Sequence, residues 1–160
     1  MIPHPFLPLF DRNSRILILG SFPSVRSREE MFFYGHPQNR FWRVVSTLLC
    51  EPLPTDVDAK RKMLLSHGIA LWDVIGSCEI QGSADATIRN AIPNDLAPIF
   101  RTADIRGVFV NGKTALRYYN IYQFPQNGIE AYCLPSTSPA NAAFGLEKLL
   151  GSWHIITEYL

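Results

Sequence analysis

The stretch Arg15-Ile-Leu-Ile-Leu-Gly20 indicates the fold class of this chain. Its four consecutive aliphatic residues form a run too short for a helix, and a glycine ends it. A continuous apolar run of this kind is typical of a strand in a parallel sheet that is covered on both faces. Comparable runs predict three further strands, over residues 69–75, 107–111 and 130–134.

Segments with helical spacing separate these strands. We expect helices over residues 39–49, 56–67, 94–102, 113–122 and 142–151. Residues 20–38 and 76–86 are rich in polar residues, glycine or proline, and we expect loops there. Strands that alternate with helices predict an α/β fold. We therefore expect a three-layer α/β/α sandwich around a mostly parallel four-stranded sheet, formed by a single domain over residues 1–160.

The composition limits the classes of function. The chain has 160 residues, of which 47% are apolar, so it can bury a substantial core. Its 15 basic and 14 acidic residues give a net charge of +1, which excludes a strongly basic or strongly acidic protein. However, residues 12–43 contain six arginines and two glutamates, a local sum of +4. This excess predicts a modest basic patch that suits a polyanion.

The cysteine and histidine residues argue against a disulfide framework and a metal centre. The three cysteines, Cys50, Cys78 and Cys133, lie far apart without CxxC spacing, so we expect a reduced, cytoplasmic protein with all three in the core. The four histidines are scattered, and no metal or other cofactor is expected. No apolar run approaches the roughly 20 residues that span a membrane.

The four predicted strands all lead into small or polar residues. These exits are Gly20–Ser24, Gly76–Cys78, Asn111–Gly112 and Pro135–Asn141. Because ligands of open parallel sheets bind beyond the carboxyl ends of the strands, the exits predict one shared cleft lined by amides and hydroxyls. Polar loops are also common in every α/β protein. The exits contain neither a phosphate-binding glycine motif nor a GxSxG nucleophile motif.

The segment Met31–Trp42 contains five aromatic residues, one histidine and one asparagine. We expect Phe32, Phe41 and Trp42 in the core, and Tyr34, next to a glycine in the loop, to be available to stack on a base. The residue-level alternatives are a structural hydrogen bond for His36 and a helix cap for Asn39.

Three motifs together resemble the uracil-DNA glycosylase superfamily: Gly20–Ser24, His36–Trp42 and Leu134–Asn141. The second is similar to the HPxNRFW stretch of mismatch-specific uracil/thymine-DNA glycosylases. The stretch Ser77–Asp85 looks most like the hypoxanthine-DNA (deoxyinosine) glycosylase branch. The resemblance extends over about residues 14–157. One departure is Phe22, which stands where mismatch-specific enzymes carry an asparagine.

The resemblance implies a monofunctional DNA repair enzyme that flips a deaminated base out of the helix and hydrolyses its N-glycosidic bond, leaving an abasic site. Hypoxanthine is the base it favours, with uracil or mismatched thymine as alternatives. It implies Asn39 as the catalytic residue. Classical uracil enzymes have a water-activating aspartate in the first motif, and this chain has none there; we also expect no lysine near the cleft that would suggest a Schiff-base lyase. The base would contact Phe22, Tyr34, His36 and Ser136. The DNA strand would contact Ser21, Ser24, Ser138, Pro139 and Asn141.

Two other functions stay open. A non-catalytic α/β module could bind nucleotides or damaged DNA, since Phe22 replaces the usual water-activating residue. A small-molecule hydrolase without a DNA partner is compatible with the net charge. For the glycosylase we expect DNA as the partner and a monomer that contacts no membrane.

Overall fold

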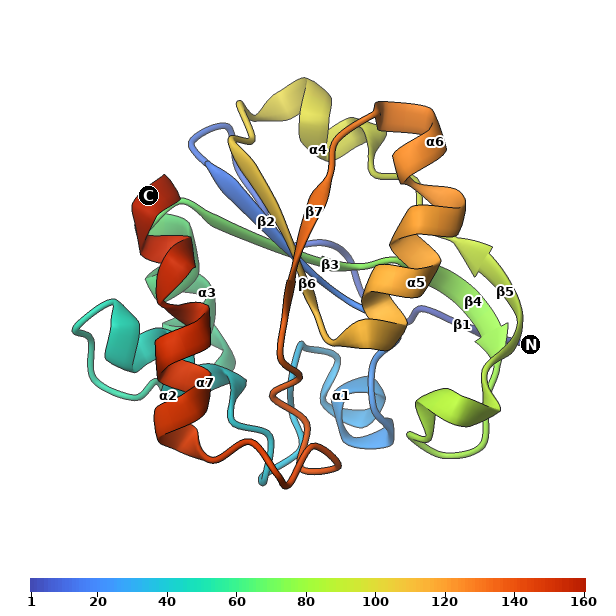
Figure 1. Cartoon of the computed structure of the whole chain (residues 1–160), viewed down its shortest axis with the longest axis horizontal. Helices are drawn as coiled ribbons and strands as arrows, with labels where there is room; N and C mark the ends of the chain where they lie inside the picture. The colour runs from blue at the N-terminus through green and yellow to red at the C-terminus, as the bar shows by residue number, and fades with distance from the viewer.

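The computed structural model describes all 160 residues and contains a central sheet of four parallel strands (Figure 1). Along the sheet the order is β3, β2, β6, β7. In the register, Ile16 of β2 lies opposite Ile69 of β3 and Gly107 of β6. The strands are β2 (Ile16–Gly20), β3 (Ile69–Asp73), β6 (Gly107–Asn111) and β7 (Ala131–Leu134).

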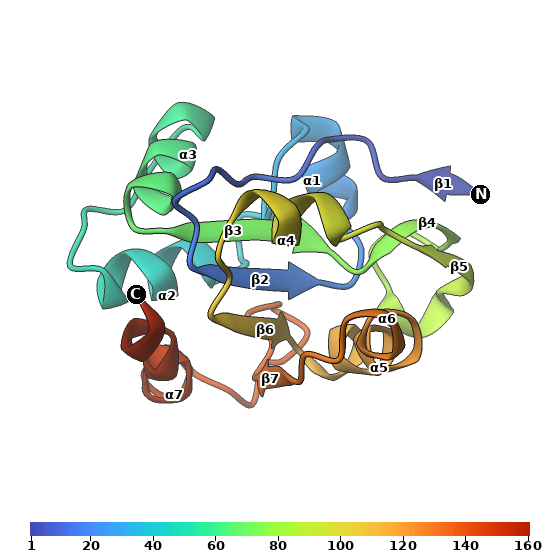
Figure 2. The same cartoon turned by 90° about the horizontal axis from the view of Figure 1, so that it is seen from above.

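Helices cover both faces of this sheet, which confirms the predicted α/β/α sandwich. Figures 1 and 2 show one group of helices on one side of the sheet and a second group on the other. The first group is α2 (Phe41–Leu48), α3 (Val57–Ser66) and α7 (Leu146–Trp153). The second is α5 (Lys113–Tyr122) and α6 (Phe124–Asn127). The short helix α4 (Ala97–Thr102) lies at the amino ends of the strands.

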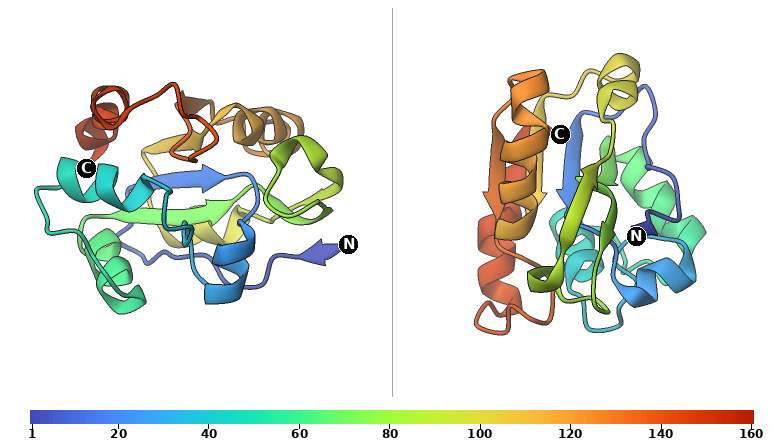
Figure 3. Two further views of the ribbon diagram at one scale, coloured as in Figure 1. Left: turned by 90° about the horizontal axis from the view of Figure 1, so that it is seen from below. Right: turned by 90° about the vertical axis from the view of Figure 1, so that its right-hand side faces the viewer.

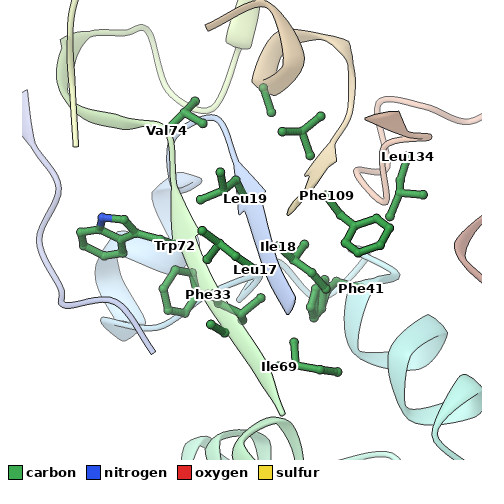
Figure 4. Close-up of a cluster of buried hydrophobic side chains, with 14 of the residues drawn as sticks. Leu17, Ile18, Leu19, Phe33, Phe41, Ile69, Trp72, Val74, Phe109 and Leu134 are labelled. Carbon is green, nitrogen blue, oxygen red and sulfur yellow. The ribbon is translucent and has the colours of Figure 1, made fainter. Parts of the chain in front are cut away.

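Strand β2 is the centre of the core, because all five of its residues are buried. In Figure 4, Leu17, Ile18 and Leu19 lie between Trp72 on one side and Phe109 on the other. Burying each large apolar side chain contributes about 1.5–3 kcal/mol. This two-sided burial explains why the β2 sequence is continuously apolar rather than alternating.

A second, antiparallel sheet is present that the sequence pattern did not predict. It contains β1 (Ile2–Pro3), β4 (Ile75–Glu79) and β5 (Arg89–Pro93), in the order β1, β4, β5. A 3₁₀ turn (Asp85–Thr87) lies between β4 and β5. The loop predicted over residues 76–86 is therefore partly wrong. Residues of β5 are mostly exposed and lack the apolar alternation that would reveal a strand.

The predicted strand over residues 69–75 is divided in two at Val74. The amides of Val74 and Ile75 donate to the carbonyls of Gly20 (2.9 Å) and Ser21 (3.1 Å). The side chain of Asn94 donates to the carbonyls of Asp73 (2.8 Å) and Ile75 (3.1 Å). These hydrogen bonds direct the chain out of the parallel sheet, and they leave Asp73 at its edge.

Two further expectations were wrong. The predicted loop over residues 20–38 contains the helix α1 (Val25–Glu30), whose six residues are too few for a visible apolar period. Of the three cysteines only Cys78 is buried, whereas Cys50 and Cys133 are exposed.

The last element is a 3₁₀ helix (His154–Tyr159). None of the helices of this chain has the length and apolarity needed to cross a membrane.

Candidate active site

A cleft of about 960 Å³ lies beyond the carboxyl ends of the parallel strands. In the right panel of Figure 3 the strands point downward toward α1, the β4–β5 connection and the loop after β7. These segments enclose the cleft. The lining includes every residue that the sequence nominated, namely Ser21, Phe22, Ser24, Tyr34, His36, Asn39, Ser136, Ser138, Pro139 and Asn141.

The two ends of the Asn39 side chain have different environments. Its Oδ1 accepts a hydrogen bond from the Phe41 amide at 2.9 Å, at the start of α2. An amide donor requires an oxygen acceptor, so this bond fixes which end of the side chain is Nδ2. No protein group accepts a hydrogen bond from Nδ2. The N-cap residue of α2 is Arg40, so Asn39 lies one position before the cap; its oxygen accepts the amide of the first helical residue, and its NH₂ is free for a ligand.

Arg40 connects the Asn39 segment to the loop after β7. Its guanidinium donates to the carbonyls of Thr137 (3.4 Å), Ser138 (2.9 Å), Asn141 (3.2 Å) and Phe144. The backbone amide of Arg40 also donates to the Thr137 carbonyl at 3.1 Å. The planar guanidinium group of Arg40 thus sets the position of the loop across the cleft from Asn39.

Asn111, at the end of β6, holds the loop after β7 by a second set of hydrogen bonds. Asn111 and Thr137 exchange two hydrogen bonds: Asn111 Nδ2 donates to Thr137 Oγ1 at 2.9 Å, and the Thr137 amide donates to Asn111 Oδ1 at 3.0 Å. Thr137 is completely buried. The loop that carries Ser136 and Ser138 is therefore fixed at both its base and its tip before any ligand binds.

Tyr34 stacks on Phe41, with ring centroids 4.1 Å apart and planes 8° apart. Phe32, Phe41 and Trp42 are buried, as predicted. Tyr34 adopts a left-handed backbone conformation (φ 53°), which is unusual for a tyrosine and which Met31, Cys50 and Asn90 also adopt. Phe41 covers one face of the ring, and Tyr34 lines the cleft.

Phe22 is also buried at the cleft. It is 8% exposed, and the guanidinium carbon of Arg28 lies 5.7 Å from its ring centroid. Arg28 also donates to the Gly82 carbonyl at 2.6 Å. A phenylalanine at this position contributes an apolar wall and no group that can activate water.

The four serines differ in whether their hydroxyl hydrogen is free. Ser21 donates to Asp85 Oδ1 at 3.0 Å, and Ser24 donates to Ser27 Oγ at 3.1 Å while capping α1. Ser136 Oγ and Ser138 Oγ only accept hydrogen bonds, from the amides of residues 138 and 140. Only Ser136 and Ser138 thus keep a hydroxyl donor for a phosphate.

The two remaining nominated polar side chains are partly used by their own loops. His36 Nδ1 accepts a hydrogen bond from the Gln38 amide at 3.1 Å, which places the ring proton on Nε2 and makes that nitrogen the free donor. Asn141 Nδ2 donates to the Ser136 carbonyl at 3.1 Å, which leaves Asn141 Oδ1 as a free acceptor.

Two carboxylates line the cleft although the first motif has none. Asp73, the last residue of β3, is 4% exposed, and its Oδ2 lies 2.7 Å from His4 Nε2. Asp85 lies in the β4–β5 connection. Partial burial raises the pKa of the Asp85 carboxyl, the charge of Asp73 adds to this effect, and hydrogen bonds from Ser21 and Thr114 oppose it. The sequence could have pointed to Asp73, because it is the one charged residue within the apolar run of residues 69–75.

The structure also corrects two statements about charge. Lys113, the first residue of α5, lines the cleft, so the expectation of no lysine there was wrong. The predicted basic patch does not form as expected: Arg15 lines a separate hollow beside His67, and Arg26 pairs with Glu30 at 2.8 Å. The chain has no group of three or more histidine, cysteine or acidic side chains placed to bind a metal ion.

Comparison with known proteins identifies the family of this chain. The sequence matches the model of the uracil DNA glycosylase superfamily over residues 7–156. It is 36% identical over 150 residues to a protein of Methanosarcina acetivorans named hypoxanthine DNA glycosylase, covering 92% of this chain and 94% of that protein. A protein of Methanosarcina barkeri with the same name is 34% identical over 143 residues, with 85% and 86% of the two chains covered.

A solved structure gives the same result for the fold. A solution NMR structure from Methanosarcina acetivorans, described as a candidate uracil DNA glycosylase, superposes with a TM-score of 0.80 at 31% identity. The match covers 98% of this chain and 99% of that one. Together with the arrangement of the three motifs around one cleft, these matches show that the chain belongs to the uracil DNA glycosylase superfamily.

Proposed function

We propose that this protein is a DNA glycosylase that hydrolyses the N-glycosidic bond of a deaminated base, with hypoxanthine as its preferred base, and leaves an abasic site. The observation that carries the proposal is the free Nδ2 of Asn39, held inside a cleft that all three motifs share. Two relatives that cover most of the chain are named hypoxanthine DNA glycosylases.

The base must leave the helix to reach this cleft. Flipping a nucleotide out of the stack costs a few kcal/mol, and the least for a mispaired or damaged base. A stacking partner recovers about 1–3 kcal/mol per base. We assign this role to the face of the Tyr34 ring that Phe41 does not cover. Phe22 would close the opposite wall.

Charge develops in two places as the bond breaks. The departing base becomes negative, and the Asn39 NH₂ would donate to it; a preorganised donor of this kind contributes about 2.7–4 kcal/mol in other enzymes. The sugar becomes positive, as in other glycosyl transfers. The carboxylates of Asp73 and Asp85 line the same cleft and would stabilise that positive charge.

The DNA strand would be bound by the two free serine hydroxyls, Ser136 and Ser138, and by Lys113. Lys113, the first residue of α5, is exposed to solvent at the lining of the cleft. We therefore assign Lys113 to phosphate contact and propose a monofunctional enzyme. We also propose that it acts as a monomer, because residues of one chain complete the cleft. The cytoplasmic location stays a prediction.

The test is excision from a set of matched duplexes, each with a single hypoxanthine, uracil, xanthine or mismatched thymine, followed by alkaline cleavage. We expect strand cleavage to be greatest with hypoxanthine. The absence of borohydride-trapped adducts would agree with monofunctional chemistry. Salt-dependent DNA binding without abasic sites would instead identify a non-catalytic binding module, and a lack of DNA binding would favour a small-molecule hydrolase.

A further inference from the structure

The glycosylase reaction consumes a water molecule, and few groups of the cleft can take a proton from it. The first-motif loop, Gly20–Ser24, contains no carboxylate, and Asn39 is a neutral amide. Two carboxylates line the cleft, those of Asp73 and Asp85. Asp73 is 4% exposed and already lies against His4, whereas Asp85 is exposed to solvent. Asp85 is therefore the carboxylate that a water molecule can reach.

The connection between β4 and β5 holds Asp85 by its own hydrogen bonds. Thr87 Oγ1 accepts from the Gln81 amide at 2.9 Å and donates to the Ala84 carbonyl at 2.6 Å. The Ile88 amide donates to the Asp85 carbonyl at 3.1 Å, and Ile88 is buried. Asp85 thus begins a hydrogen-bonded turn rather than lying in an irregular loop.

Three hydrogen bonds join residues 21–28 to this connection. In the first, Ser21 Oγ donates to Asp85 Oδ1 at 3.0 Å. The other two run from the Arg28 guanidinium to the Gly82 carbonyl (2.6 Å) and from the Val25 amide to Ser83 Oγ (2.9 Å). The first motif and helix α1 therefore fix the position of a carboxylate that the first motif does not itself contain.

The Asp85 carboxylate keeps room to accept a hydrogen bond from water. An ionised carboxylate has about four acceptor positions on its two oxygens. Ser21 uses one of them, and Thr114 supplies one further hydrogen bond. Partial burial raises the pKa of this carboxyl, which makes its anion a stronger base than that of an ordinary aspartate. The protein thus orients the carboxylate without saturating it.

We infer that Asp85 is the catalytic residue that orients the attacking water and takes its proton, and that Ser21 is the residue that positions Asp85. The inference rests on the proposed glycosylase function and names a base for the water that this function consumes. Asp73 and Asp85 both contribute negative charge to the cleft, but only Asp85 takes a proton.

In this step the water oxygen bonds to C1′ of the sugar, while the bond from C1′ to the base nitrogen breaks and its electron pair leaves with the base. The water proton moves to the Asp85 carboxylate, which then releases it to solvent. The base anion, to which the Asn39 NH₂ donates, takes up a proton from solvent. A positioned general base contributes about 10²–10⁴-fold to a rate.

The first experiment measures single-turnover excision of hypoxanthine by Asp85→Asn, which keeps the shape of the side chain and removes the base. We expect excision to be at least about a hundredfold slower. Binding to an undamaged duplex should stay equal to that of the wild type or become tighter, because one negative charge is lost. Equal excision by Asp85→Asn and the wild type would overturn the assignment.

The matched control is Asp104→Asn, which changes an exposed aspartate at the opposite end of the sheet. It should match the wild type in both excision and binding. A melting curve and the retained DNA binding of Asp85→Asn show that its loss of excision does not come from unfolding. A parallel loss of DNA binding and excision in Asp85→Asn would contradict a role in the chemical step.

The pH profile separates a base from a structural group. Excision by the wild type should fall as the pH drops through the raised pKa of Asp85, because the protonated acid cannot accept the water proton. The ratio of wild-type to Asp85→Asn excision should therefore decrease toward equality at low pH. A ratio that stays constant with pH would overturn the assignment.

This ratio, rather than the wild-type rate, is the quantity to compare, because other groups near Asp85 can also titrate or carry charge. The charged or titratable groups in the cleft or beside the β4–β5 connection are His4, Arg28, His36, Asp73, Cys78 and Lys113. All of them are present in both proteins, so their effect on the rate is common to both.

Ser21 is tested by the same pH profile. Its hydrogen bond favours the ionised carboxylate and so lowers the pKa of Asp85. Ser21→Ala should therefore slow excision less than Asp85→Asn does, and it should move the acid fall of the profile to higher pH. A lower rate at every pH without such a movement would show that Ser21 does not position Asp85.

Azide ion tests whether Asp85 faces the reacting carbon. Azide is an anionic nucleophile that needs no base, and in Asp85→Ala it can occupy the volume that the carboxylate leaves. It would bond to C1′ as the base departs with its electron pair, and the mass of the DNA product would show azide in place of hydroxyl. We expect azide to speed excision by Asp85→Ala and to leave the wild type unchanged. Neither an azide product nor a faster rate would place Asp85 away from C1′ and refute the inference.

The glycosylase function and the role of Asp85 fail in different ways. A wild-type protein that removes no deaminated base from any duplex would refute the function itself. A wild-type protein that removes hypoxanthine, together with an equally active Asp85→Asn variant, would refute only the role of Asp85.

Discussion

Asn39 illustrates how one side chain serves both the fold and the chemistry. Its Oδ1 accepts the Phe41 amide, and its Nδ2 has no partner. Because the two functions use different atoms, substitutions can separate them. A neutral amide is not a useful base, so its contribution in the cleft is the donor.

The first prediction therefore compares two substitutions at this position. Asn39→Ala removes the acceptor of the Phe41 amide and the donor, and should lower stability by about 1 kcal/mol and hypoxanthine excision at least about tenfold. Asn39→Asp keeps the oxygen that accepts this amide but offers an acceptor where the donor was. It should retain stability in urea unfolding and lose excision to the same extent. Full activity in Asn39→Asp would show that only the hydrogen bond to the Phe41 amide matters.

The second prediction concerns Asp85 and pH. Its pKa is raised above the ordinary 3.8, mainly by burial. A carboxyl with a higher pKa in the folded state binds its proton more tightly when folded, so ionisation opposes folding. Asp85→Asn should therefore raise Tm at neutral pH. Because residue 85 as a whole stays in contact with solvent, which screens the effect, the gain is small, about 1–3 °C.

The raised pKa of Asp85 also determines the pH range in which Asp85→Asn raises Tm. The difference in Tm between Asp85→Asn and wild type should shrink as the pH falls and vanish below the ordinary pKa, where Asp85 is protonated in both states. Calorimetric scans between mildly acidic and neutral pH measure it. A gain that stays constant with pH would point to a packing effect rather than to charge.

At the scale of elements, the loop after β7 depends on one side chain from another segment. The Arg40 guanidinium binds four carbonyls of residues 137–144. Counted only as a charge in the sequence, Arg40 was assigned to a basic patch. The structure shows instead that it holds the wall of the cleft that carries Ser136 and Ser138.

The third prediction follows from the planar shape of this group. Arg40→Lys preserves the charge but cannot donate to four carbonyls at once. We expect a loss of about 1–3 kcal/mol in unfolding free energy and a fall in both DNA affinity and excision. Arg43→Lys, on the neighbouring helix α2, is the matched control. Equal behaviour of the two variants would show that Arg40 acts only as a charge.

The elements also show how far the sequence could lead. The four parallel strands were predictable because two-sided burial makes them continuously apolar, as in β2. The three motifs could be placed because parallel strands bring their exits to one edge. By contrast β5, largely exposed, and α1, only six residues long, carry no periodic signal. The pairing of His4 with Asp73 joins residues 69 positions apart, which no local pattern reveals.

At the scale of the whole molecule, a net charge of +1 limits how strongly this protein can bind DNA nonspecifically. Among the arginines near the cleft, Arg28 and Arg40 already donate to backbone carbonyls. Lys113 is the one lysine that lines the cleft, and its side chain can contact a phosphate. We therefore expect only a shallow dependence of affinity on salt, and selectivity that comes mainly from the base.

The fourth prediction is that Lys113→Ala weakens binding to about the same degree on damaged and undamaged duplexes. The slope of log affinity against log salt concentration should fall by about 1. Lys148→Ala, on helix α7 outside the cleft lining, should leave the slope unchanged. A loss confined to hypoxanthine duplexes would place Lys113 at the base rather than at a phosphate.

Residues 2–4 contribute to the interior of the fold, since β1 pairs with β4 and His4, which follows β1, lies against the carboxylate of Asp73 at the end of β3. Removing residues 1–4 would therefore take away both the pairing of β1 with β4 and the His4 hydrogen bond to Asp73, so a change remote from the three motifs would alter the lining of the cleft.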